Sequence, residues 1–175
     1  MTLKKTNAAR LLDSFGLPYS LHYAEYDEND LSALALAHSM GIPPAQIYKT
    51  LVVRGNSPDG SCVVMACIPG PDELDLKKLA TAAGLKNAAL TPLKEVLQLT
   101  GYQRGGCSPL AAKKQYPIFL DESAVLWDKI FVSAGLRGHQ LLLAPDVLIR
   151  AANLAANNEQ AAIYADLCRS DLRHS

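Results

Sequence analysis

The sequence predicts a single α/β domain in which a mixed β-sheet is surrounded by helices. Helical and strand-like patterns alternate along the chain, and a strong β-hairpin pattern lies between two helical segments. No internal repeat, low-complexity tract or long linker divides the 175 residues, a length typical of one domain. Because 49% of the residues are hydrophobic, the chain can bury a core without disulfide bonds.

The first half of the chain is predicted to place two helices before a β-hairpin. Apolar residues recur at helical spacing in both helical segments, and glycines end them. The helices are predicted over residues 4–15 and 31–40, with an extended segment over residues 17–23. Residues 47–55 and 61–69 are rich in β-branched and aromatic side chains and flank the turn formers of "NSPDG". These two segments are therefore predicted to pair.

The second half is predicted to alternate between helices and short strands. Thr91 as an N-cap and Pro92 at the first helical position predict the start of one helix. Helices are predicted over residues 75–84, 91–101, 123–127 and 145–156, and strands over residues 116–121, 129–135 and 139–145. The predicted domain covers residues 1–156, and residues 157–175 are predicted to be a tail with a frayed helix.

The charges of the chain argue against a strong solitary nucleic-acid binder. Lysine plus arginine and aspartate plus glutamate both number 17, so no global positive field attracts a polyanion. The charges are segregated into an acidic run at residues 25–30 and scattered basic residues at 77–114. A solvated face is the favoured interpretation of each cluster, and local contact with an anion stays open.

The sequence predicts a reduced cytoplasmic protein without a metal or cofactor. The N-terminus lacks the features of a secretory signal, and no apolar run reaches transmembrane length. Cys62 and Cys67 are predicted to point to opposite faces of one strand, which argues against a local disulfide or a shared metal. The four histidines show no metal-ligand spacing with one another or with the cysteines.

The segment "TGYQRGGCSPL" combines two adjacent glycines with a helix-start signal. Ser108 followed by Pro109 predicts an N-cap and first turn for a short helix over residues 110–115. Gly105 and Gly106 would then let a ligand oxygen approach unpaired main-chain N–H groups, holding a phosphate or an oxyanion. A simple turn into a helix is the alternative.

The chain resembles the YbaK/EbsC-type aminoacyl-tRNA deacylases through four motifs in order: "IYKTLVVRG", "LDLKKLA", "TGYQRGGCSPLAAKK" and "VSAGLRG". It is similar, more distantly, to the editing domain of bacterial prolyl-tRNA synthetases. The resemblance implies a compact domain with a partly barrel-like mixed sheet, and a pocket for the aminoacylated 3′ end of tRNA. It also implies cleavage of Cys-tRNA(Pro) in trans, beside prolyl-tRNA synthetase. The synthetase could supply much of the tRNA affinity that a chain with a net charge of zero lacks.

The resemblance also implies the residues of the site. It assigns substrate binding to Lys49, Gly105, Gly106, Ser108 and Pro109. The main-chain N–H groups of Gly106, Cys107 and Ser108 would stabilise an oxyanion, while the thiol of the cysteinyl substrate attacks its own carbonyl carbon.

Three positions depart from the family pattern. Ala24 stands where a tyrosine is expected, Ala111 where a glycine commonly follows Ser-Pro-Leu, and Gln140 where an acidic residue is common. The reaction class is therefore more firmly implied than the amino-acid specificity.

The residues by themselves leave alternatives at two positions. Strand alternation puts Lys49 on a face with apolar residues, where a lysine either extends to water or forms a pocket wall that binds phosphate or ribose. Cys107 could be a nucleophile before a helix N-terminus, although no neighbouring residue supplies its base, or simply a small residue beside the glycines. A non-catalytic module that binds a nucleotide or tRNA end through the same loop is the alternative function.

Overall fold

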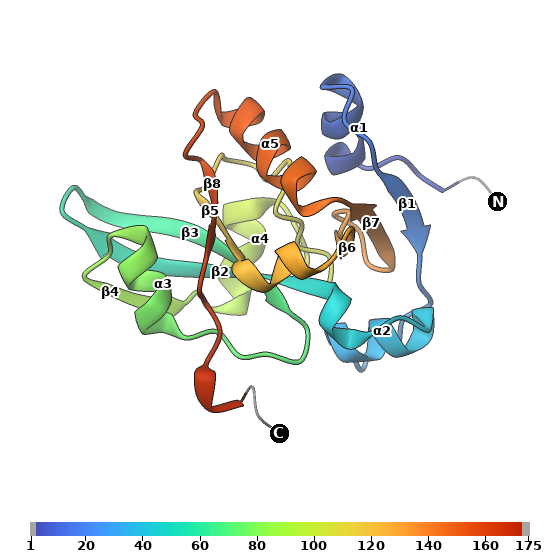
Figure 1. Cartoon of the computed structure of the whole chain (residues 1–175), viewed down its shortest axis with the longest axis horizontal. Helices are drawn as coiled ribbons and strands as arrows, with labels where there is room; N and C mark the ends of the chain where they lie inside the picture. The colour runs from blue at the N-terminus through green and yellow to red at the C-terminus, as the bar shows by residue number, and fades with distance from the viewer. Residues whose placement is uncertain (1–2, 173–175) are drawn as a thin grey trace.

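The computed structural model describes residues 3–172, and Figure 1 shows how their helices and strands are arranged. The α-helices are α1 (Asn7–Ser14), α2 (Ala33–Met40), α3 (Leu76–Ala83), α4 (Leu93–Thr100) and α5 (Pro145–Ala156). The strands are β1 (Ser20–Tyr23), β2 (Ile47–Ser57), β3 (Gly60–Pro69), β4 (Asn87–Leu90), β5 (Ile118–Asp121), β6 (Ile130–Ser133), β7 (His139–Leu143) and β8 (Ala162–Ala165). Short 3₁₀ helices are η1 (Pro44–Gln46), η2 (Glu122–Leu126) and η3 (Ser170–Leu172). Among the described residues, no helix is long and apolar enough to cross a membrane.

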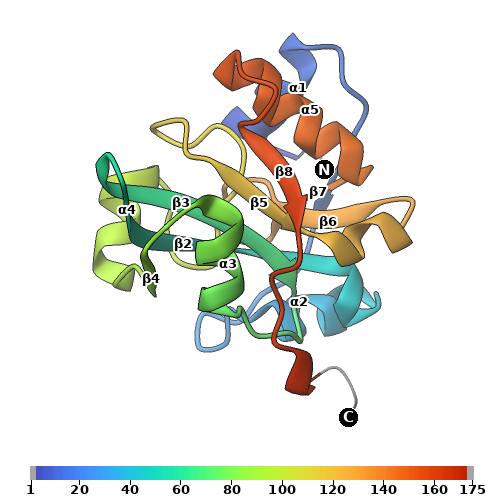
Figure 2. The same ribbon diagram turned by 60° about the vertical axis from the view of Figure 1, so that its left-hand side comes forward.

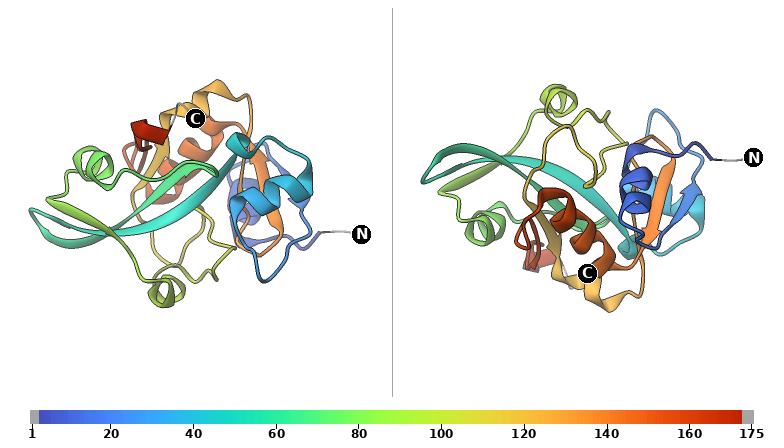
Figure 3. Two further views of the ribbon diagram at one scale, coloured as in Figure 1. Left: turned by 90° about the horizontal axis from the view of Figure 1, so that it is seen from below. Right: turned by 90° about the horizontal axis from the view of Figure 1, so that it is seen from above.

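The predicted hairpin is confirmed and is the longest strand pair of the sheet. β2 and β3 pair antiparallel from Tyr48 opposite Pro69 to Ser57 opposite Gly60. Because side chains alternate between the faces of a strand, the hairpin presents apolar groups on both sides. Helices α3 and α4 lie on opposite faces of the hairpin (Figure 3).

The remaining strands extend the hairpin into the predicted mixed sheet. Within the described residues the sheet has eight strands in the order β1-β7-β6-β2-β3-β5-β8, and β4 pairs separately with β2. The pairs β2 with β6, β3 with β5 and β5 with β8 are parallel, and the others are antiparallel. Since this order has two ends, the sheet is curved but not closed into a barrel.

The main core lies between the sheet and the helix pair α1 and α5, which run side by side in Figures 1 and 2. Leu12 of α1 and Leu148 of α5 are fully buried against apolar side chains of β5, β6 and β7. A second cluster packs α3 against β2 and β3, and a third packs α2 against β2 and β6. The sheet therefore needs helices on several sides to exclude water.

Most predicted elements are present, and the helix predicted over residues 145–156 coincides with α5. The helix predicted over residues 110–115 is wrong, because this segment bends without forming a helix. The Tyr102 hydroxyl donates to the carbonyl oxygens of Leu110 and Ala111, at 2.6 and 3.0 Å, and Ala111 adopts a φ of 58°. A helix would use those carbonyls for its own hydrogen bonds and would require a negative φ.

Three further expectations differ from the structure. Pro92, not Thr91, is the N-cap residue of α4, because the Thr91 N–H donates to the Val52 carbonyl at 3.0 Å and its side chain makes no cap bond. The sequence pattern missed β4, whose "NAAL" carries no strand signal. The frayed helix predicted within the C-terminal tail is wrong at residues 162–165. These residues form β8, which pairs in parallel with β5.

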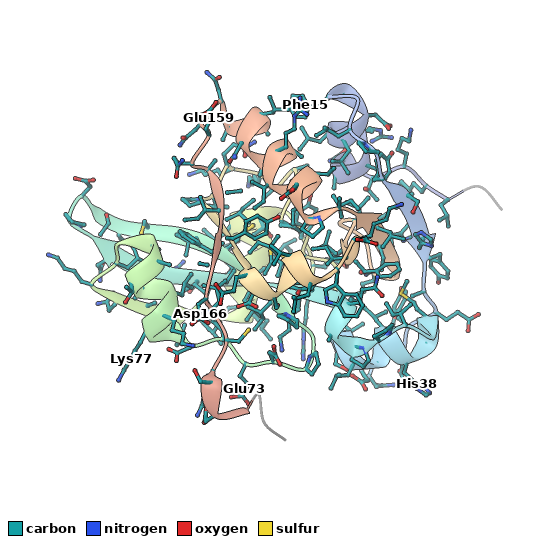
Figure 4. The ribbon with its side chains drawn as sticks, in the orientation of Figure 1. Phe15, His38, Glu73, Lys77, Glu159 and Asp166 are labelled. Carbon is teal, nitrogen blue, oxygen red and sulfur yellow. The ribbon has the colours of Figure 1, made fainter. Side chains whose placement is uncertain are left out.

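The segment after β8 is held to the domain by a buried carboxylate and exposed ion pairs. Asp121 is fully buried; one of its oxygens accepts from the Leu167 N–H at 3.0 Å and the other from the Ser123 N–H at 3.1 Å. Figure 4 shows Glu73 and Asp166 beside this segment, where they pair with Arg169 and Lys78. Exposed pairs contribute little to stability, so the buried Asp121 contacts are the stronger attachment.

Asp121→Ala should lower the free energy of unfolding by about 2–4 kcal/mol, because two main-chain N–H groups lose a charged acceptor. Urea denaturation measures this change. Asp128→Ala is the matched control, since Asp128 is exposed and its removal should change stability by less than about 0.5 kcal/mol. Equal stability of the two variants would show that the Asp121 contacts do not hold the C-terminal segment.

Candidate active site

The candidate site lies where one edge of β2 lacks a partner strand. On that edge β2 pairs with β6 only at Ile47 and Tyr48, and with β4 only from Val53 to Asn56. A cavity of about 640 Å³ lies at the intervening residues 49–52. The uncovered strand edge is therefore one wall of a cavity large enough for a nucleoside with an attached amino acid.

The other walls of the cavity are mostly apolar. The segment before α2 and its first turns contribute Leu31, Ala33 and Leu36, and the segment that enters α4 contributes Leu90, Pro92, Leu93 and Val96. The glycine loop contributes Arg104, Gly105 and Cys107, and strands β6 and β7 contribute Ser133 and Gln140. A few polar groups in an apolar cavity are typical of a small-molecule site.

Lys49 is at the cavity, as the sequence predicts, and its ammonium is partly buried. Its Nζ donates to the carbonyl oxygen of Gly70 at 3.0 Å. Burial lowers the pKa of Lys49, while Asp72 and Glu73 act in the opposite direction. The hydrogen bond to Gly70 uses one of the three N–H groups of the ammonium, so the group is fixed in place and can still bind a ligand.

The two glycines of the loop permit close packing as well as an unusual backbone. Gly105 has a φ of +79°, and an added Cβ would lie 3.1 Å from side-chain atoms of Leu31. At Gly106 an added Cβ would lie 3.1 Å from the backbone nitrogen of Arg137. The Arg137 side chain also donates from Nε to the Arg104 carbonyl at 2.9 Å. The loop therefore rests against Leu31, just before α2, on one side and against the β6–β7 connection on the other.

The structure brings only part of the predicted loop set to the cavity. Gly105 and Cys107 line it, whereas Gly106, Ser108 and Pro109 do not. The Gly106 N–H donates to the Gln103 carbonyl at 3.0 Å, so it is already occupied. Ser108 is fully buried, and its Oγ accepts from the Leu110 N–H at 3.2 Å. Since no helix begins here, the helix N-terminus on which the loop prediction rested is absent.

The environment of Cys107 does not favour a nucleophilic thiolate. Burial raises the pKa of its thiol to about 11, and a hydrogen bond with Thr100 opposes this shift only in part. Its partner in this hydrogen bond is a hydroxyl and not a histidine, so no general base is shown beside the sulfur. The alternative interpretation, in which Cys107 is simply a small residue beside the glycines, is the better supported one.

Several residues that line the cavity were not predicted from the sequence as site residues. Gln140, noted as a departure, lines the cavity and is only 2% exposed. Thr91, predicted as a cap, also lines it. Arg104 lies exposed at the rim of the cavity. Ala24, which stands where a tyrosine is expected, is buried, and its N–H donates to the Gly138 carbonyl.

Comparison with known proteins reveals several similarities. A family model described as an aminoacyl-tRNA editing domain matches residues 27–151. The chain is 45% identical over 152 residues to the Enterococcus faecalis protein named "Putative Cys-tRNA(Pro)/Cys-tRNA(Cys) deacylase EbsC", covering 87% of this chain and 91% of that protein. It is 32% identical over 89 residues to a proline–tRNA ligase of Thermosipho africanus, covering 51% of this chain and 15% of the ligase.

A solved structure shows the same fold. The protein described as "a putative trans-editing enzyme for prolyl tRNA synthetase" superposes with a TM-score of 0.74 at 24% identity, over 97% of this chain and 100% of its own. The order of elements around the cavity is therefore that of a known fold.

Alkylation of Cys107 by iodoacetamide should be slow near neutral pH and should accelerate with pH. A thiol with a pKa of about 11 is on the order of one part in a thousand thiolate at pH 8. The matched control is Cys62, which is partly exposed, as Cys107 is. Mass spectrometry of the labelled peptides measures both rates, and faster labelling of Cys107 than of Cys62 at pH 8 would contradict this expectation.

Proposed function

This chain belongs to the family of aminoacyl-tRNA editing domains, and from that premise we propose that it removes cysteine from mischarged proline tRNA in trans. The enzyme class is that of an aminoacyl-tRNA deacylase. The cavity at the uncovered edge of β2 is the observation that carries the proposal, because it combines apolar walls with the ammonium of Lys49 and the glycine loop.

The cavity suits chemistry in which the substrate supplies its own nucleophile. The substrate thiol sulfur attacks the ester carbonyl carbon, the bond from that carbon to the tRNA oxygen breaks, and the thiol proton passes to the departing hydroxyl. The products are a cysteine thiolactone and uncharged tRNA. The protein then needs only to hold the reacting groups close together and to stabilise the oxyanion. The raised pKa of Cys107 agrees with a protein that does not provide the attacking sulfur.

The proposed roles of the predicted site residues follow their positions. Lys49 binds the phosphate or ribose of the terminal nucleotide through the N–H groups that Gly70 leaves available. At the loop, the amide of Cys107 is the best placed of the predicted oxyanion donors, because Gly106 is occupied. Ser108 and Pro109 then shape the loop from outside the cavity, and Gly105 lines the cavity while it packs against the Leu31 side chain.

The proposed partner is prolyl-tRNA synthetase, which charges the tRNA that this enzyme edits. The net charge of zero supports a partner that contributes affinity for the tRNA backbone. The proposed activity belongs to the cytoplasm, because aminoacyl-tRNA is made and used there.

A deacylation assay with a panel of mischarged tRNAs tests the function. Purified protein should release cysteine from Cys-tRNA(Pro) faster than it releases alanine or serine from the same tRNA. Preferred release of another amino acid would assign a different substrate. Tight tRNA binding without ester cleavage would support a non-catalytic binding module instead.

Lys49→Ala should lower kcat/KM for deacylation by about 10- to 100-fold, the range expected for loss of a charge-assisted hydrogen bond. The fold should persist, with stability reduced by about 1 kcal/mol or less, because the lost hydrogen bond is only partly buried. Lys86→Ala is the control, since it removes an exposed lysine outside the cavity. Unchanged turnover in folded Lys49→Ala would reject the proposed role.

Cysteinyl-tRNA should be cleaved much faster than seryl-tRNA, although the two substrates differ only by sulfur for oxygen. An apolar site separates such similar side chains by only about a hundredfold, so greater discrimination requires the superior nucleophilicity of sulfur. Methylation of the substrate thiol should therefore abolish cleavage. Equal rates for cysteinyl and seryl esters, or rapid cleavage of the S-methyl ester, would mean that water or an enzyme group attacks.

A further inference from the structure

The uncovered edge of β2 presents main-chain hydrogen-bonding groups to the cavity. Along an antiparallel pair, alternate residues direct both their N–H and C=O groups to the same side. Odd-numbered residues of β2 face β3, as the hydrogen bond from the Gly70 N–H to the Ile47 carbonyl shows. Even-numbered residues therefore face the other edge, where Thr50 and Val52 lie between the ends of β6 and β4.

One of these edge groups is already paired, and the others are not. The Val52 carbonyl accepts from the Thr91 N–H at 3.0 Å. The pairing with β6 stops at Tyr48 and that with β4 starts at Val53, so within residues 3–172 no strand covers the Thr50 carbonyl or the Val52 N–H. The edge thus offers an acceptor followed, two residues later, by a donor, and unpaired groups of this kind favour a ligand or water.

The segment that enters α4 closes the edge next to Val52. The Thr91 N–H donates to the Val52 carbonyl, and the Thr91 hydroxyl oxygen has almost no accessible surface, so a ligand in the cavity does not reach it. The Thr50 carbonyl and the Val52 N–H are therefore the groups that this edge offers to a ligand.

The shape of the gap restricts what can bind there. Figure 2 shows β4 and β6 at opposite ends of β2, so the gap is closed at both ends and a peptide cannot add as a further strand. The apolar side chains of Leu31, Leu90 and Leu93 line the space in front of it. A flat, mostly apolar group with an acceptor next to a donor on one edge fits this space.

We propose that the open edge of β2 binds the adenine base of the terminal nucleotide of tRNA. The Thr50 carbonyl accepts from the amino group at C6, and the Val52 N–H donates to N1. The base is then held between apolar walls, which positions the ester relative to Lys49 and the glycine loop. This inference rests on the proposed function, because that function brings a terminal adenosine into the cavity.

Hypoxanthine tests the pattern because it reverses both edge groups. Its O6 is an acceptor that would face the Thr50 carbonyl, and its N1 carries a hydrogen that would face the Val52 N–H. Purine lacks the C6 amino group and loses one bond without adding repulsion. Recognition through this edge therefore predicts that binding is strongest for adenine, weaker for purine and weakest for hypoxanthine.

The first experiment compares cysteinyl-tRNA(Pro) that ends in adenosine, purine riboside or inosine. We expect kcat/KM to fall about tenfold for purine riboside and about 100-fold or more for inosine, as expected for loss of one hydrogen bond and for reversal of two. Equal rates for the three substrates would overturn the inference and leave the proposed function intact. Failure to cleave even the adenosine substrate would contradict the proposed function, and the binding measurement below would then decide the inference alone.

The second experiment measures binding without catalysis. In NMR titrations of the full chain, AMP should shift the Val52 amide resonance, and IMP at equal concentration should not. Equal effects of AMP and IMP on the Val52 amide resonance would overturn the inference.

Discussion

The divided edge of β2 is the constraint on which the candidate site depends. On one side β3 pairs with β2 from Tyr48 to Ser57, which keeps β2 in the interior of the sheet. On the other side β6 approaches in parallel and β4 approaches antiparallel, so neither strand continues the other. Residues 49–52 are left uncovered by this topology. The sheet therefore supplies one wall of the cavity, and the α2 region, the segment that enters α4 and the glycine loop supply the others.

The second requirement is close approach between backbones around that rim. Gly55 lets β4 pair with β2, since a Cβ there would lie 2.5 Å from the Asn87 carbonyl oxygen. Gly106 does the same for the loop against the backbone of residues 136–137, and Gly105 lets the loop pack on the Leu31 side chain. The Tyr102 hydroxyl then donates to the carbonyl oxygens of Leu110 and Ala111. These contacts hold the loop without a helix, which explains why a helix-start signal at Ser108 is used for a turn.

The electrostatics of the cavity favour binding over covalent catalysis by the protein. Lys49 is partly buried, and the Gly70 carbonyl fixes its ammonium at 3.0 Å. Cys107 is buried enough that its pKa rises to about 11, so its thiol stays protonated at neutral pH. A site with one fixed cation, main-chain donors and a protonated thiol is suited to positioning a substrate that contains its own nucleophile.

Local signals in the sequence determined the hairpin, the helices that end at glycines, the bounds of α5 and the position of Lys49 on β2. Each depends on residues close together in the chain: turn formers, caps and side-chain periodicity. Motif order likewise identified the family. The tertiary structure alone decided that β4 and β8 are strands, that residues 110–115 form no helix, and that Thr91 joins the β2 edge instead of capping α4. It also decided which loop residues face the cavity. These outcomes depend on hydrogen bonds between segments distant in the chain, such as Thr91 with Val52, and no local pattern encodes which distant group will be nearby.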